Sequence, residues 1–166
     1  TLPHYDDFVF DVLDAILSNG RTSRIYTSLV KEKQMVLSAG SYQGLPGARL
    51  DNLFVIHAVP RHPHTPTAIE EALEEEIKKL QTIPVTEWEL QKVRNQIDAS
   101  AVRQLESNMG LASQLTFFQL AAGDWQYILQ QREIFKKVTP EDIIRVAREY
   151  LVKGNRVVAM LTPPEQ

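Results

Sequence analysis

The sequence predicts an α+β fold in which an antiparallel or mixed sheet packs against several helices. Runs of strand length lie early and late in the chain, at 35–42, 53–59 and 156–161, and helical periodicity fills most of the chain between them. The 166 residues have the length of one domain and an ordinary globular composition, 43% hydrophobic and 23% charged. No repeat or internal linker divides the chain. We therefore expect one domain over residues 1–166.

The first two elements are predicted to be helices. Residues 6–18 repeat apolar side chains at i, i+3, i+4 and i+7, with Asp6 or Asp7 as the expected cap and Gly20 just past the end. A shorter helix is expected over 22–33, capped by Thr22 or Ser23.

The next two elements are predicted to be strands. The runs 35–42 and 53–59 flank a loop of turn-forming residues at 44–48, so the simplest pairing is an antiparallel hairpin. The second run is apolar on both faces except for His57, which indicates a central strand covered by helices with His57 in the interior. The run 156–161 is expected to be a final buried strand.

An acidic helix follows the hairpin. Its start is predicted from Thr67 and Glu70, which have the spacing of a capping box. Its glutamates precede Lys78 and Lys79 by one helical turn, which favours a solvated, ion-paired face over paired catalytic carboxylates.

The remaining helices have recognisable starts. Thr86 opens a helix whose 3.6-residue periodicity continues through 90–115, and Gly110 is the expected place for a bend or break. Asp124 and Thr139 are expected to cap two further helices. The large aromatic residues of this region are interpreted as packing residues: Trp88, Phe117, Phe118 and Trp125.

The composition excludes several kinds of chemistry. The chain has no Cys and a net charge of −3, which exclude thiolate chemistry and disfavour nucleic acid or an anionic membrane as partners. No apolar stretch is long enough to span a membrane, and a cytoplasmic or a periplasmic location fits equally well. His62 and His64 form the only histidine cluster and lack a third ligand. We expect no metal site and no catalytic residue in this chain.

Six short phrases, in order, resemble a known family. They include Ser-Arg-Ile-Tyr at 23–26, Thr-Glu-Trp-Glu-Leu at 86–90 and Val-Thr-Pro-Glu-Asp-Ile at 138–143, and the others lie at 29–34, at 106–107 with 122–124, and at 150–151. Together they resemble the non-catalytic domain of the pitrilysin/insulinase zinc peptidases, the inverzincins, over essentially all of the chain. The resemblance implies a domain that packs against a second domain carrying H-x-x-E-H. Zinc and the general base would belong to that domain, while this one helps to enclose a peptide substrate.

The resemblance also points to one substrate-binding candidate. Some family members hold substrate with an Arg and a Tyr after the helix that begins Ser-Arg-Leu-Tyr. The matching Arg position is Lys31, and the Tyr position falls at Leu37 or Ser38. Lys31 keeps the charge without the planar fork of Arg, and the Tyr hydroxyl has no replacement.

Two further expectations concern the surroundings of the domain. The ends of the chain have the character of a loop and a linker, so we expect an excised piece that lacks at least one upstream strand and the catalytic domain. Its unprotected sheet edge is then expected to cause self-association. Two alternatives stay open: a scaffold or assembly subunit with the same fold and no proteolysis, and a stand-alone peptide-binding module.

Overall fold

The structure is a computed structural model that describes residues 2–161, and it confirms the α+β class. The proline-rich end at 162–166 lies outside the described residues. The elements in chain order are α1 (Tyr5–Ser18), the π-helix η1 (Tyr26–Glu32), β1 (Val36–Leu45), β2 (Leu53–Pro60), α2 (Pro66–Thr82), α3 (Glu87–Leu105), α4 (Asn108–Ala121), α5 (Tyr127–Lys137), α6 (Pro140–Tyr150) and the short 3₁₀ turn η2 (Lys153–Asn155).

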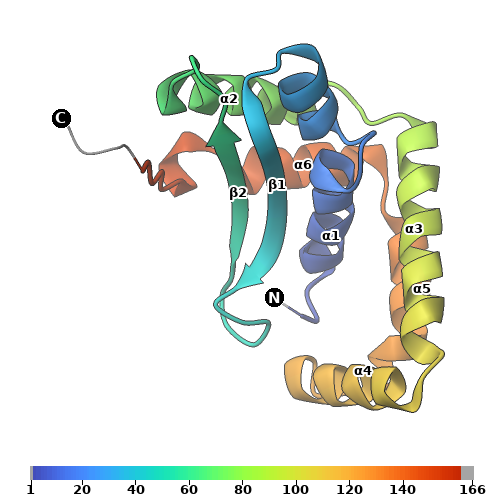
Figure 1. Ribbon diagram of the computed structural model, residues 1–166. Coiled ribbons are helices and arrows are strands. Elements are labelled where there is room, and N and C mark those ends of the chain that lie inside the picture. The colour runs from blue at the N-terminus through green and yellow to red at the C-terminus, as the bar shows by residue number, and fades with distance from the viewer. Residues whose placement is uncertain (1, 162–166) are drawn as a thin grey trace.

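The helices pack against one face of an antiparallel hairpin. In Figure 1 the hairpin passes in front of α6 and runs beside α1, and α2 crosses one end of it. α3 and α5 run side by side at one flank, and α4 lies across the bottom. α1 is the central element of the core, because Val9, Val12, Leu13 and Leu17 are fully inaccessible to solvent. They pack with buried residues of α3, α5 and α6. A second cluster joins η1, β1 and α2 through Leu29, Val36, Ile69 and Ala72.

Two predicted helix starts are confirmed, and those of α1, α2 and α5 are wrong. At α5 the cap residue is Gln126, and Asp124 accepts from its N–H at 2.8 Å instead of capping the helix. Thr86 and Thr139 both form complete capping boxes. At α1, however, the cap is the His4 ring nitrogen, which accepts from the backbone N–H of Asp6, while the Asp6 carboxylate faces Arg145 instead. At α2 the cap is Thr65, two residues before the predicted Thr67, because Pro66 suits the first helical position.

The short helix after α1 differs from its prediction in type. Helical turns begin at Arg24, and most of the segment is π-helical, with the Lys33 N–H donating to the Ser28 carbonyl at 2.8 Å. Ser23 does not cap the helix, because its hydroxyl donates to the Gly20 carbonyl. Gly20 has φ +82°, which confirms it as the left-handed residue that ends α1.

The predicted strand at 156–161 is wrong. Within residues 2–161 the sheet has only β1 and β2, and 156–161 is extended chain without a strand partner, with Val157 96% exposed. Arg156 is instead anchored to α2 by Glu70 and Glu74, at 2.8 and 2.6 Å. β-Branched composition indicates extended backbone but does not say whether a sheet edge lies within reach.

β2 is also more open than predicted. His57 is exposed on the outer face of the hairpin rather than buried, because no helix covers that face in the described part of the chain. Its ring lies over Gly40 on the paired strand, where a Cβ atom would be 2.9 Å from the imidazole. Tyr42 flanks the same ring at 6.1 Å between centroids.

The long periodic stretch is broken, as predicted, close to Gly110. α3 ends at Leu105, and Ser107 caps α4 by accepting from the Gly110 N–H at 3.0 Å. A Cβ on Gly110 would lie 1.9 Å from the Gln104 carbonyl oxygen. Glycine at 110 therefore permits the close approach of the two helices at this elbow.

The aromatic residues of these helices are mostly on the surface. Only Phe118 is buried, whereas Trp88, Trp125 and Phe117 are 65%, 46% and 44% exposed. The packing interpretation is therefore wrong for three of the four. Periodicity identifies the buried face of a helix only when the opposite face is polar, and α4 is apolar on both.

Candidate functional site

The segment that carries Lys31 is held in place by three polar links. Arg24 forms a bidentate pair with Glu89 at the start of α3, at 2.8 and 3.0 Å. Ser28 donates to Glu76 on α2 at 2.8 Å, and Lys33 pairs with Glu75 one residue earlier in α2. η1 is thus fixed against two helices before the chain enters β1.

These links have distinct electrostatic consequences. The Arg24 guanidinium, together with hydrogen bonds from Thr86, holds the pKa of Glu89 at about 2, against a smaller upward effect of burial. Glu76 is only 3% exposed and accepts from both Ser28 and Lys79, so the prediction of a wholly solvated acidic face is wrong at this residue. Glu70, Glu74 and Glu75 are ion-paired as expected.

Lys31 lies in the last turn of η1 with an exposed side chain. Its ammonium group forms no hydrogen bond or ion pair within the described residues. The chain then turns at Gln34, whose φ is +51°, and the Met35 N–H donates to the Leu29 carbonyl as β1 begins. Of the two positions that match the family Tyr, Leu37 is 60% exposed and Ser38 is exposed as well.

The hairpin beside Lys31 presents unpaired strand edges. Each strand pairs only with the other in the part of the chain that the structure describes, so the outer edge of each lacks a strand partner. An edge of this kind offers backbone N–H and C=O groups to an additional extended strand. This geometry suits recognition of a peptide by its backbone, with Lys31 near one end to attract a carbonyl oxygen or a carboxylate.

Polar residues along one face of α1 form hydrogen bonds with β1 of the hairpin. Gln43 donates to Asp11 and to the Asp7 carbonyl, and Ser41 donates to Asp14. Burial raises the pKa of Asp11 to about 7, helped by the charge of Asp7. Burial likewise raises the pKa of Asp14, although its hydrogen bonds from serines oppose the rise. The α1 acids have i, i+4, i+7 spacing, which is the signal in the sequence for this polar face.

A second network joins α1 to α6, and no local pattern in the sequence indicates it. Asp6 accepts from Arg145 and from the Tyr150 hydroxyl, and the Arg145 guanidinium keeps the pKa of Asp6 below its ordinary value. Tyr5 donates to Asp142 at 2.9 Å, and burial is the main reason why its pKa rises to about 12. These pairs are separated by more than 130 residues, so local spacing gives no sign of them.

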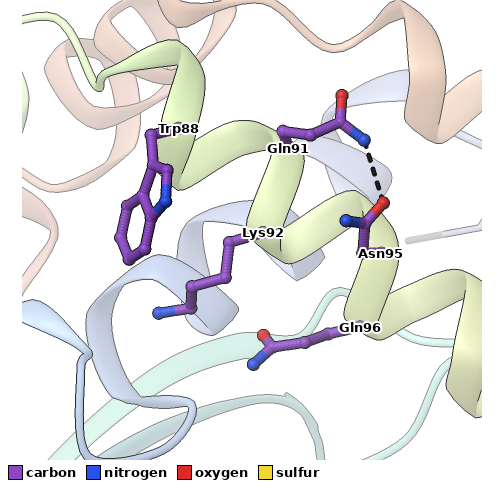
Figure 2. A pocket seen from close by; sticks show the side chains of 5 residues that line it. All are labelled: Trp88, Gln91, Lys92, Asn95 and Gln96. Atoms are coloured by element: carbon purple, nitrogen blue, oxygen red, sulfur yellow. Dashed lines mark hydrogen bonds between the residues drawn. The ribbon is translucent and has the colours of Figure 1, made fainter.

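A shallow hollow on α3 gathers an aromatic ring and amide groups. Figure 2 shows Trp88, Gln91, Lys92, Asn95 and Gln96 along one side of the helix. Lys92 lies 5.7 Å from the Trp88 ring centre and donates to Thr22, while Gln91 donates to Asn95. None of these side chains is a carboxylate, hydroxyl, thiol or imidazole, and the Lys92 ammonium group is engaged with Thr22 and the Trp88 ring, so we describe the hollow as a contact surface.

The residues described hold no group of three His, Asp or Glu side chains placed to bind a metal ion. His62 lies in the exposed loop between β2 and α2, and His64 is partly buried there. Among residues 2–161 no helix combines the length and the apolar character needed to cross a membrane.

The fold and the site together define the class of protein. It is an α+β domain with an open hairpin and with helices that are linked to one another by polar contacts. Residues 1–97 match the family model described as the peptidase M16 inactive domain, which covers more than half of the chain. The chain belongs to this family of inactive peptidase domains.

The chain also resembles individual proteins. It is 26% identical over 164 residues to the zinc protease PqqE of Helicobacter pylori, a match that covers 96% of the chain and 35% of that protein. The chain therefore spans about a third of the length of this curated relative.

Two solved structures share the fold. A protease from Helicobacter pylori superposes with a TM-score of 0.83 at 24% identity, over 93% of this chain and 36% of that one. The inactive peptidase domain of a candidate zinc protease from Bordetella parapertussis superposes with a TM-score of 0.82 at 20% identity, over 99% of this chain and 87% of that one. At these identities the likeness concerns the fold alone.

Proposed function

We propose that this chain is the non-catalytic domain of a zinc-dependent metallopeptidase, which packs against an H-x-x-E-H domain of the same parent and helps to enclose its peptide substrate. The membership of the inactive-domain family carries the proposal. Zinc and the general base would then belong to the catalytic domain, and this chain would contribute walls, a strand edge and positive charge.

Lys31 is the residue proposed to touch the peptide. It is exposed, it has no partner within the described residues, and η1 is held firmly beneath it by Arg24, Ser28 and Lys33. The Lys31 ammonium group, at one end of a strand edge, attracts peptide carbonyl oxygens or a carboxylate. Unlike the planar guanidinium of an Arg, it does not fix their orientation. Its contribution is accordingly modest.

The test is to reconstitute peptide cleavage from this chain and the catalytic domain of the same parent. We expect zinc-dependent cleavage of an unfolded peptide to rise about tenfold or more when the chain is added. Lys31→Ala should raise KM about threefold with little change in kcat, because it removes an interaction with the bound substrate. Lys78→Ala, on the solvent face of α2, is the control and should leave both constants unchanged.

Other outcomes would favour one of the two alternative functions. A parent without H-x-x-E-H would contradict the proposal and favour the scaffold or assembly subunit. Affinity of the chain alone for an extended peptide, with no effect on the catalytic domain, would favour the stand-alone peptide-binding module.

A further inference from the structure

One side of α4 is an exposed apolar stripe. Met109, Phe117 and Leu120 are 77%, 44% and 61% exposed, and their spacing of eight and three residues places them on one face of the helix. The opposite side contains Phe118, the one buried residue of the described helix, and faces α3 and α5.

The stripe has an unusual environment for a surface helix. No charged residue occurs from Ser107 to Gly123, so no acid or base helps to solvate α4. The residues between the apolar ones on this face are small and polar, such as Ser113 and Thr116. A contiguous exposed patch of this kind marks a surface that is covered by a partner.

The elbow at Gly110 presents the stripe away from the rest of the domain. Ser107 caps α4, and the close approach of Gly110 to the Gln104 carbonyl sets the angle between α3 and α4. In Figure 1 α4 runs across the bottom of the molecule, and its main contacts are with α3 and α5.

We propose that the α4 stripe, defined as Met109, Phe117 and Leu120, is the docking surface for the catalytic domain of the parent. This inference rests on the proposed function and names the surface through which it works. The chain corresponds to 35% of its Helicobacter pylori relative, so most of such a protein lies outside the matched part and is available as the occupant. Because α4 carries no charge, the surface it fits is an apolar groove about 20 Å long, the length of fourteen helical residues.

A second copy of the chain is the less favoured occupant. Two identical helices without charged residues would have no charged pair to fix their register or orientation. A groove on a different domain provides both through its shape.

Cysteine labelling tests the proposal in the intact parent protein. This chain has no natural Cys, so Leu120→Cys and Met109→Cys each introduce its only thiol. Leu50→Cys, in the loop between the strands, is a matched control, because Leu50 is 60% exposed and Leu120 is 61% exposed. Maleimide labelling is followed by mass spectrometry of the peptide that contains each Cys, in the isolated chain and in the parent.

We expect labelling at positions 120 and 109 to be about tenfold or more slower in the parent than in the isolated chain, and labelling at position 50 to be equal in both. Equal rates at 120 and 109 would overturn the inference, while the cleavage experiment would still support the proposed function. Slow labelling in the isolated chain that depends on its concentration would assign the stripe to a second copy and also overturn it. A parent without a catalytic domain would overturn both proposals.

Discussion

Replacement of Asp11 by Asn is expected to stabilise the protein at pH 8 and to leave its stability near pH 4 almost unchanged. Asp11 lies on the face of α1 behind β1 and accepts from the Gln43 amide at 2.5 Å. Burial and the neighbouring Asp7 raise its pKa to about 7. Asn has the same shape and keeps an acceptor for Gln43, but it brings no charge to this interface.

The direction of this pH dependence of stability follows from the number of protons that the folded and unfolded states bind. Because the pKa of Asp11 rises from 3.8 to about 7 on folding, the folded protein binds more protons than the unfolded chain between these values. The contribution of Asp11 to stability is therefore fully present below about pH 4 and is lost as the pH rises through 7. Three pH units correspond to about 4 kcal/mol at most. Since Asp11 is only partly buried, water screens its charge and we expect about 2 kcal/mol at pH 8.

Urea unfolding at pH 4.5, 6 and 8 measures this difference. The gap between Asp11→Asn and the natural protein should widen as the pH rises, whereas Asp51→Asn, at an exposed site in the hairpin loop, should show no such trend. Parallel curves of free energy against pH for the Asp11→Asn variant and the natural protein would refute the reasoning.

Two other predictions concern the elbow and the open sheet. Gly110→Ala should destabilise the protein by about 1–3 kcal/mol, although Ala is the better helix former, because its Cβ would meet the Gln104 backbone. Gly47→Ala, which has open space around it, should be nearly neutral in the same thermal unfolding experiment. The chain alone is also expected to self-associate by pairing at a hairpin edge, and a strictly monomeric mass in sedimentation at high concentration would contradict this.

Local chemistry explains which parts of the fold could be predicted. The Thr86 and Thr139 boxes and the Gly20 end of α1 each depend on residues within a few positions of one another, and the hairpin depends on two adjacent runs joined by one loop. A strand at 156–161 requires a free sheet edge within reach, and the local sequence does not show whether such an edge is present. The prediction that His57 is buried was wrong for a related reason, because no helix covers the outer face of the hairpin in the described part of the chain.

The candidate site likewise combines local features, which the sequence indicates, with long-range contacts, which it does not. Lys31 remains a candidate that rests on the phrase around it, and both that motif and the end of the helix are local features of the sequence. The links that hold its helix are not local, since Arg24 meets Glu89 and Ser28 meets Glu76 across 65 and 48 residues. The acids of α1 do have a visible helical spacing, yet only the structure places them against Ser41 and Gln43 rather than in solvent.

The weak attachment of α4 has a consequence for the lifetime of the protein before assembly. The described helix buries a single side chain, Phe118, and makes its main contacts with α3 and α5, so its local opening costs far less free energy than unfolding of the α1 core. Amide hydrogens of α4 would exchange early, and its backbone would be the segment most open to cellular proteases. A molecule whose catalytic domain has not yet docked would thus be cut first at the proposed docking surface.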